Sequence, residues 1–156
     1  MGNLYIMIGV PGSGKSTEAK RIMRTHSVIR ERVEIVSADT YFMNENGDYA
    51  FNPKGLGEAH AECFRDACDY ATRGVDCIIV DNTNLTNVER APYYQLGVAF
   101  GYKVHMVWVH PGLTCEELGA RNVHGVSAEK IRTMFQRFEG VLPPHWKVQQ
   151  HNVNGV

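Results

Sequence analysis

The chain has 156 residues, of which 44% are hydrophobic and 21% are charged, and its formal net charge at pH 7 is -1. This length fits one compact core, so we expect a single domain over residues 1–156. The composition excludes disorder and fibrous structure, and the near-neutral charge excludes a protein that coats nucleic acid by charge alone.

The cysteines and the first residues give no sign of a metal centre or of a targeting signal. The four cysteines (Cys63, Cys68, Cys77 and Cys115) show neither a CxxC pair nor metal-ligand spacing, which favours reduced thiols. Residues 1–8 lack the basic region and cleavage site of a signal peptide, and their apolar run is too short to cross a bilayer. We therefore expect a cytoplasmic enzyme without membrane contact.

The first part of the chain predicts a strand, a glycine loop and a helix, followed by a second strand. The apolar run at 4–8 leads into glycines and then into a helical stretch from Lys15 to about Arg24. A second strand is expected at 33–37. The polar stretch 40–55 that follows contains Asn-Gly-Asp and Asn-Pro turn signals, which favour a loop near the site.

The middle of the chain alternates helix and strand. Residues 56–74 carry apolar side chains at helical spacing, and Gly74 is suited to close that helix. A strand is expected at 75–80, where Cys77-Ile78-Ile79-Val80 forms an unbroken apolar run that is typical of a parallel strand buried on both faces. A helix is expected at 87–100 and a further strand at 102–110, where Pro-Gly then breaks the pattern.

The last part predicts two helices, at 114–122 and 128–139, with Ser127 as the N-cap of the second. A short edge strand is expected within 146–153. Strands that alternate with helices predict an α/β fold of three layers, in which a parallel sheet of four to five strands carries helices on both faces.

A phosphate-binding loop stands between the first strand and the first helix. Gly9, Gly14, Lys15 and Ser16 satisfy the pattern GxxxxGK[ST], in which backbone N–H groups and the helix N-terminus cradle phosphates. Lys15 is expected to reach the β- and γ-phosphates, and the Ser16 hydroxyl to bind Mg²⁺. The predicted ATP-binding residues of the loop are Gly9, Pro11, Gly12, Ser13, Gly14, Lys15, Ser16 and Thr17.

Two acidic segments directly follow apolar strands. Asp39 lies within Ser37–Tyr41, and Asp81 begins the segment Asp81–Asn84. The carboxyl ends of parallel strands meet at one edge of the sheet, where ligands bind, so both segments are site candidates. Either carboxylate suits Mg²⁺ or an attacking hydroxyl.

The chain resembles the polynucleotide-kinase-type P-loop kinases, which include 5′-hydroxyl polynucleotide kinases and related viral hydroxymethyluridine DNA kinases. The likeness spans about residues 4 to 139. It rests on the glycine loop Gly9–Ser16, on Asp39 after the second strand, on Asp81–Asn84 after the third, and on Arg121-Asn122 followed by the helix at 127–135.

The resemblance implies a P-loop kinase fold and a kinase that uses ATP and Mg²⁺, with nucleic acid, DNA or RNA, as the acceptor. It implies that Asp39 acts as general base and that Arg121 reaches over the ATP phosphates from a lid between Asn122 and Ser127. Ser16 and Asp81 are the candidate metal residues. Asp39, Tyr41, Thr83 and Asn84 are the candidate acceptor-side residues.

Simpler interpretations remain open for three of these side chains. Asp39 is also a suitable turn residue, Asp81 fits a strand-end Asp-Asn turn as well as a magnesium partner, and Arg121 fits a solvated arginine at a helix end. The chain also departs from the family: Tyr41-Phe42-Met43 stands where an arginine often follows the aspartate, and the lid has His124-Gly125 instead of further basic residues.

Three functions follow from these observations. The first is a kinase for a hydroxyl on nucleic acid, either a 5′ end or a hydroxymethylated base. The second is a kinase for a small nucleoside or metabolite. The third is an ATP-dependent switch module without phosphotransfer, since a nucleotide site alone does not fix function.

Overall fold

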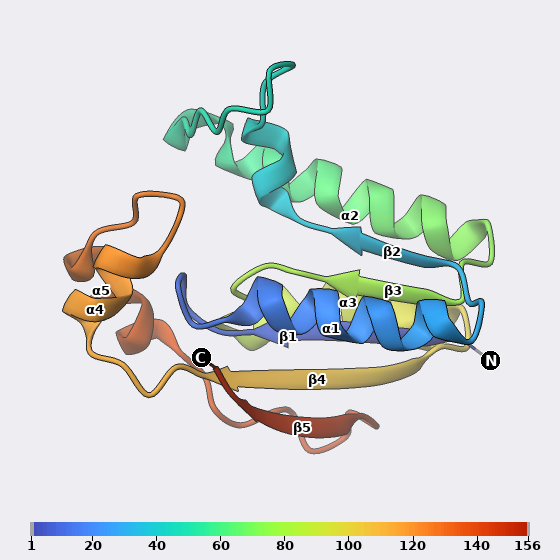
Figure 1. The fold of residues 1–156 in the computed structure, drawn as a ribbon. Helices are drawn as coiled ribbons and strands as arrows, with labels where there is room; N and C mark the ends of the chain where they lie inside the picture. The colour runs from blue at the N-terminus through green and yellow to red at the C-terminus, as the bar shows by residue number, and fades with distance from the viewer. Residues whose placement is uncertain (1, 156) are drawn as a thin grey trace.

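Five parallel strands form one sheet in the order β2-β3-β1-β4-β5 in the computed structural model, which describes residues 2–155. The strands are β1 (Asn3–Ile8), β2 (Val33–Val36), β3 (Cys77–Val80), β4 (Lys103–His110) and β5 (Gln149–Asn154). Their carboxyl ends all point to one edge of the molecule (Figure 1). The predicted parallel sheet is therefore confirmed.

Helices cover both faces of this sheet, as the alternation of side chains along β1 requires. Met7 faces α1 (Lys15–Val28) and packs with Ala19 and Ile22, whereas Leu4, Ile6 and Ile8 face the opposite side. That side is covered by α2 (Leu56–Thr72) and α3 (Asn87–Ala99). In Figure 1 α1 lies in front of the sheet and α3 behind it, which gives the three predicted layers.

The position of β3 follows from its composition. All four of its side chains are fully buried, because β2 and β1 flank it and helices cover both faces. A buried aliphatic side chain contributes roughly 1.5–3 kcal/mol to the stability of the fold relative to an exposed one. The central position of β3 therefore requires a strand with apolar side chains on both faces.

The carboxyl edge of the sheet carries the remaining elements. Two short 3₁₀ helices, η1 (Ala38–Phe42) and η2 (Pro53–Gly55), follow β2, and α4 (Cys115–Arg121) and α5 (Ala128–Arg137) follow β4. The last two helices pack around Leu118 and Ile131, which also contact Val10 of the glycine loop. Ser127 caps α5 by accepting a hydrogen bond from the backbone N–H of Lys130, as predicted.

Several element ends differ from the sequence prediction. The first helix continues to Val28 instead of Arg24, because His26 of the extra turn packs between Tyr5 and Glu31. The expected loop at 40–55 includes η1, η2 and an antiparallel bridge between Met43 and Tyr49. The edge strand is present but occupies Gln149–Asn154.

The described residues contain neither a membrane-spanning helix nor a cluster of metal-ligating side chains. None of the helices within residues 2–155 combines the length and the apolar character that a membrane span needs. No group of three or more His, Cys, Asp or Glu side chains in that range is arranged to hold a metal ion.

Candidate functional site

The glycine loop follows a path that only glycine allows at two positions. Gly12 and Gly14 have φ angles of 80° and 97°, in the left-handed region that other residues rarely adopt. A side chain at Gly12 would also place its Cβ 3.0 Å from the backbone oxygen of Leu118 in α4. The backbone N–H of Gly9 donates to the Thr83 oxygen at 3.1 Å, which ties the loop to the segment after β3.

The loop leads into an uncapped helix N-terminus. Gly14 precedes α1 and offers no side-chain cap, so the first N–H groups of the helix are free for an anion. The Ser13 hydroxyl beside them is buried and has no hydrogen-bond partner among the described residues. Phosphate oxygens would satisfy both sets of donors.

The structure brings Asp81 against the end of this loop. The Ser16 hydroxyl donates to Asp81 Oδ2 at 2.8 Å, and the Lys15 ammonium lies 3.6 Å from Asp81 Oδ1. The Oδ1 atom is buried and lacks a hydrogen-bond partner within residues 2–155. The Ser16 hydroxyl and the Asp81 carboxylate fit Mg²⁺, and the Lys15 ammonium beside them fits the phosphates of a nucleoside triphosphate.

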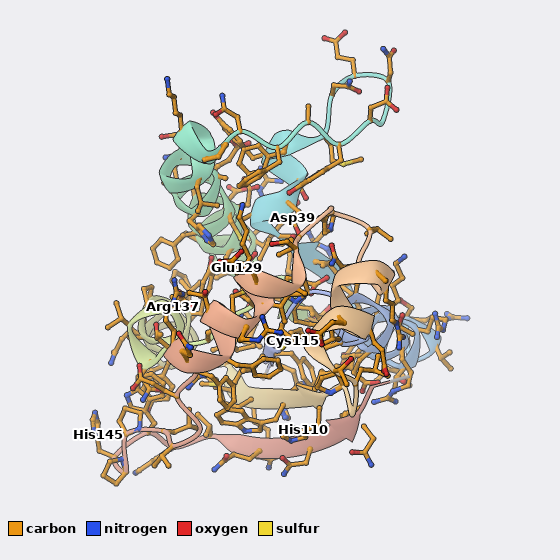
Figure 2. The ribbon with its side chains drawn as sticks, turned by 90° about the vertical axis from the view of Figure 1, so that its left-hand side faces the viewer. Asp39, His110, Cys115, Glu129, Arg137 and His145 are labelled. Atoms are coloured by element: carbon orange, nitrogen blue, oxygen red, sulfur yellow. The ribbon has the colours of Figure 1, made fainter. Side chains whose placement is uncertain are left out.

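Asp39 lies elsewhere on the same edge, held by residues from two other segments. The Tyr49 hydroxyl donates to Asp39 Oδ1 at 3.3 Å, and His124 Nε2 lies 3.3 Å from Asp39 Oδ2. The rings of Tyr49 and His124 are in contact, with centroids 4.4 Å apart. In Figure 2 Asp39 lies on the segment that follows β2, on the side of that segment toward the α4–α5 pair.

This arrangement affects the Tyr49 hydroxyl. Burial, together with the negative charge of Asp39, raises the pKa of Tyr49 to about 12, so the phenol stays protonated at neutral pH and donates to the carboxylate. About half of the Asp39 side chain remains exposed. An approaching hydroxyl therefore has access to a carboxylate that is already oriented.

Asn84, the acceptor-side candidate at the end of the Asp-Asn-Thr-Asn segment, is buried. It is 3% exposed, and its side-chain amide donates to the Met7 oxygen of β1 at 2.7 Å. Asn82 similarly accepts a hydrogen bond from the Ala38 backbone at 2.8 Å. Thr83 is half-buried and contributes its backbone oxygen to the loop at Gly9.

The lid is a short turn fastened by one side chain. The Asn122 amide donates to the backbone oxygens of Leu118, Gly119 and Val126, and its oxygen accepts from the Val126 N–H. Arg121 ends α4, is exposed, and makes no hydrogen bond or ion pair with the described residues. It is therefore free to approach bound phosphates.

Two residues of this site, Tyr49 and His124, were not among the predicted site residues. The Asn46-Gly47 turn is the one signal that points to Tyr49, because it reverses the chain and returns Tyr49 to within reach of Asp39. No sequence signal links His124 to Asp39, since the contact is between segments that are 85 positions apart and depends on the packing of α4 and α5.

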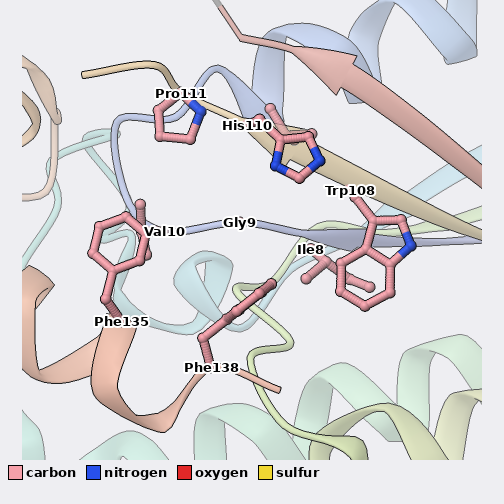
Figure 3. A pocket seen from close by; sticks show the side chains of 9 residues that line it. Ile8, Gly9, Val10, Trp108, His110, Pro111, Phe135 and Phe138 are labelled. Atoms are coloured by element: carbon pink, nitrogen blue, oxygen red, sulfur yellow. The ribbon is translucent and has the colours of Figure 1, made fainter. Parts of the chain in front are cut away.

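A small recess opens beside the glycine loop. Its volume is about 70 Å³, and it is lined mainly by apolar side chains of β4 and the α5 region: Val10, Trp108, Val109, Phe135 and Phe138, with His110 and Pro111 at its margin (Figure 3). Small-molecule pockets usually measure about 300–1,000 Å³. The recess is therefore a packing irregularity beside the loop, and we place no ligand in it.

The sequence is similar to named proteins over most of its length. Residues 4–141 match the profile of the AAA domain family. The chain is 37% identical over 140 residues to NEDD4-binding protein 2 of Homo sapiens, covering 87% of this chain and 8% of that protein. It is 26% identical over 133 residues to 2′,3′-cyclic-nucleotide 3′-phosphodiesterase of Mus musculus, covering 84% of this chain and 30% of that protein. It thus spans less than a third of either relative.

Solved structures share the fold at low sequence identity. Kti12 of Chaetomium thermophilum with ADP-AlF3 superposes with a TM-score of 0.70 at 17% identity, over 97% of this chain and 88% of that one. The APS kinase CysC of Mycobacterium tuberculosis with AMPPNP and APS gives 0.58 at 20%, over 97% and 88%. A chain of the Pnkp1/Rnl/Hen1 RNA repair complex gives 0.60 at 21%, over 86% and 44%. The fold is that of the P-loop kinases.

Proposed function

The chain belongs to the AAA domain family, and from that membership and the geometry of its site we propose that it transfers the γ-phosphate of ATP to a hydroxyl group on nucleic acid. The acceptor is a 5′-hydroxyl end or a hydroxymethylated base. The fold shared with the APS kinase CysC and with a chain of the Pnkp1/Rnl/Hen1 complex supports a phosphotransferase of P-loop kinase type, and the nucleic-acid acceptor is the step that we add.

One observation carries this proposal: the two carboxylates of the site are engaged by different partners. Asp81 contacts Ser16 and Lys15 at the glycine loop, whereas Asp39 contacts Tyr49 and His124. These contacts support a role for Asp81 on the donor side, with Mg²⁺. Asp39 remains as the carboxylate for the acceptor hydroxyl, and a module that only binds ATP has no need of it.

The donor half acts by positioning and charge. The backbone N–H groups of the loop and of the first turn of α1 hold the phosphates, while Lys15 adds positive charge at the transferring group. Mg²⁺, held at Ser16 and Asp81, supplies further charge compensation when bound. Arg121, at the end of α4, adds a further positive charge to these phosphates when the lid approaches them.

The acceptor half supplies the base. The acceptor oxygen attacks the γ-phosphorus, the bond from that phosphorus to the bridging oxygen breaks, and ADP leaves with the electron pair. The hydroxyl proton passes to the Asp39 carboxylate. The hydrogen bond from Tyr49 and the contact with His124 hold the carboxylate in place. The base is therefore already oriented when the acceptor hydroxyl lines up with the γ-phosphate.

A second candidate function is a kinase for a free nucleoside. The segment from Asp39 to Glu58 carries four carboxylates (Asp39, Glu45, Asp48 and Glu58) and a single lysine, Lys54. Such an acidic segment does not attract the phosphates of a polynucleotide. A free nucleoside carries no phosphate, so its binding does not require a basic segment.

Transfer of radiolabel from ATP with Mg²⁺ to a panel of acceptors tests the proposal. The panel contains 5′-hydroxyl DNA, 5′-hydroxyl RNA, hydroxymethyluracil DNA and free nucleosides. We expect label on a nucleic acid, abolished in Lys15→Ala because phosphate charge is no longer compensated. Asp39→Asn should keep ATP binding but lose transfer at least 100-fold, because the proton acceptor is gone.

The outcomes separate the candidates. Label on free nucleosides alone selects the second candidate. ATP hydrolysis without label on any acceptor contradicts both kinase functions, and full activity of Asp39→Asn contradicts the role of Asp39 as base.

A further inference from the structure

Large apolar side chains are exposed on the segment that follows Asp39. Tyr41, Met43, Phe51 and Leu56 are each between 42% and 45% exposed. Phe42 is buried beneath them and meets the rings of Tyr41 and Phe51 edge-on, with centroids 5.2 and 5.0 Å away. Apolar side chains gathered on one surface, with a buried ring as support, are typical of a binding site.

This surface begins at the carboxylate of the proposed base. Tyr49 donates its hydroxyl hydrogen bond to Asp39, and its ring lies nearly parallel to that of Phe51, at an angle of 11° and a centroid distance of 6.4 Å. We call Tyr49, Phe51 and Tyr41 the aromatic surface, in which Tyr41 is joined to Phe51 through the ring of Phe42. A planar group that rests on the aromatic surface lies next to Asp39.

The charges of the segment that carries the aromatic surface do not favour recognition of a phosphate backbone. The segment 39–58 holds the four carboxylates and the one lysine named above, and one of those carboxylates, Glu58, is paired with Arg65 of α2. Nucleic-acid backbones bind where Lys and Arg outnumber acids. Stacking of bases on aromatic rings needs no such charge and contributes about 1–3 kcal/mol per base.

We infer that the aromatic surface binds the base of an unpaired terminal nucleotide whose 5′-hydroxyl is the acceptor. The inference rests on the proposed function and names the part of the acceptor that this site recognises. A paired end keeps its base inside the duplex, so the protein requires a single-stranded end. Recognition through the base also explains how Tyr41-Phe42-Met43 can occupy the place where related kinases often carry an arginine.

Phe51 is the side chain to change, because its exposure lets it be removed without opening the core. Phe51→Ala removes the ring, and Phe51→Tyr keeps an aromatic face. Phe100 at the end of α3 is similarly exposed, at 49%, and lies near Gly2 and Tyr102 at the opposite edge, so Phe100→Ala is the matched control. The free energies of unfolding of all three variants are compared first.

Transfer to three acceptors is then measured: a single-stranded 5′-hydroxyl oligonucleotide, the same oligonucleotide with an abasic 5′-terminal nucleotide, and the free nucleoside. We expect Phe51→Ala to lower kcat/KM for the intact oligonucleotide about 5- to 150-fold, mostly through KM, which is the loss that stacking implies. The abasic end should be as poor with wild-type protein as the intact end is with Phe51→Ala. Phe51→Tyr and Phe100→Ala should match the wild type.

Other results overturn the inference in recognisable ways. Equal use of intact and abasic ends shows that the base is not recognised, while the kinase function stands. A free nucleoside used as well as the oligonucleotide shows that no strand is required. Absence of transfer to all acceptors by the wild type contradicts the proposed function itself.

Discussion

Gly12 shows how one residue sets the shape of the phosphate site. Its φ angle is 80°, and a Cβ there would lie 3.0 Å from the Leu118 oxygen. We expect Gly12→Ala to lower the free energy of unfolding by about 1–3 kcal/mol, the usual range for a strained backbone residue. Because the loop must move to relieve the contact, ATP affinity should fall more than about 10-fold, as measured by calorimetry.

Gly57 provides the control for this change. It lies within α2, has no positive φ angle, and a Cβ there meets nothing within 4 Å. Gly57→Ala should therefore raise the free energy of unfolding by about 0.5–1 kcal/mol and leave ATP affinity unchanged. Equal ATP affinity in Gly12→Ala and the wild type would contradict the steric explanation.

At the residue scale, the sequence prediction agrees with the structure where a feature depends on residues that are close together along the chain. The glycine loop could be predicted because its glycines, Lys15 and Ser16 are consecutive or nearly so and each has a local reason to be there. The burial of Asn84 could not, because its amide bonds to Met7, which lies 77 positions away along the chain.

The pairing of β4 with β5 is the element-scale feature that responds to pH. His105 of β4 is buried, with Nδ1 2.9 Å from His151 Nε2 of β5 and Nε2 2.9 Å from the Asn3 side-chain oxygen. Tyr5 stacks on its ring at 4.2 Å. Burial, with smaller contributions from His151, Lys103 and His26, lowers the pKa of His105 to about 4.

This lowered pKa makes stability depend on pH. His105 is protonated near pH 6.5 in the unfolded chain, whereas in the folded protein it stays neutral down to about pH 4. Its contribution to stability is therefore fully present above pH 6.5 and is lost as the pH falls from there toward 4. Between pH 7 and pH 5 we expect a loss of about 2 kcal/mol from this group.

Urea unfolding at pH 7 and pH 5 measures this loss. His105→Gln cannot be protonated in this range, so the drop in its free energy of unfolding should be smaller than that of the wild type. His60→Gln changes an exposed histidine of α2 and should keep the wild-type drop. The same drop in His105→Gln and the wild type would exclude His105 as the cause.

At the scale of elements, the strands and most helices were predictable, because periodicity and glycine signals are local. The end of α1 was not, since its last turn depends on the contacts of His26 with Tyr5 and Glu31. The bounds of β5 were likewise decided by pairing, because its exposed residues have little apolar pattern and align with β4 through backbone hydrogen bonds.

Arg90 of α3 joins distant parts of the whole molecule. It is fully buried, and its guanidinium donates to the Asn84 and Leu85 oxygens and to the Asn87 side chain. It also lies over the rings of Trp108 and Phe138, at 4.9 and 5.9 Å. Burial lowers its pKa to about 10, so it remains charged at neutral pH.

Removal of this charge should destabilise the entire fold. Arg90→Met keeps much of the side-chain volume but leaves two buried backbone oxygens and the half-buried Asn87 oxygen without their donor, so we expect a loss of roughly 3 kcal/mol in the free energy of unfolding. Arg73→Met removes an exposed arginine paired with Asp69 and should cost less than about 1 kcal/mol. Similar losses in the two variants, measured by denaturant unfolding, would refute the role of Arg90.

The sequence by itself determined the parallel sheet, its covering helices and the phosphate loop, because each depends on residue patterns within short stretches of chain. Only the tertiary structure decided which side chains each of the two carboxylates contacts. Asp39 and Asp81 both follow apolar strands, and local sequence cannot distinguish them. The difference arises because strand order and packing bring Asp81 to Lys15 and Ser16, and bring Tyr49 and His124 to Asp39.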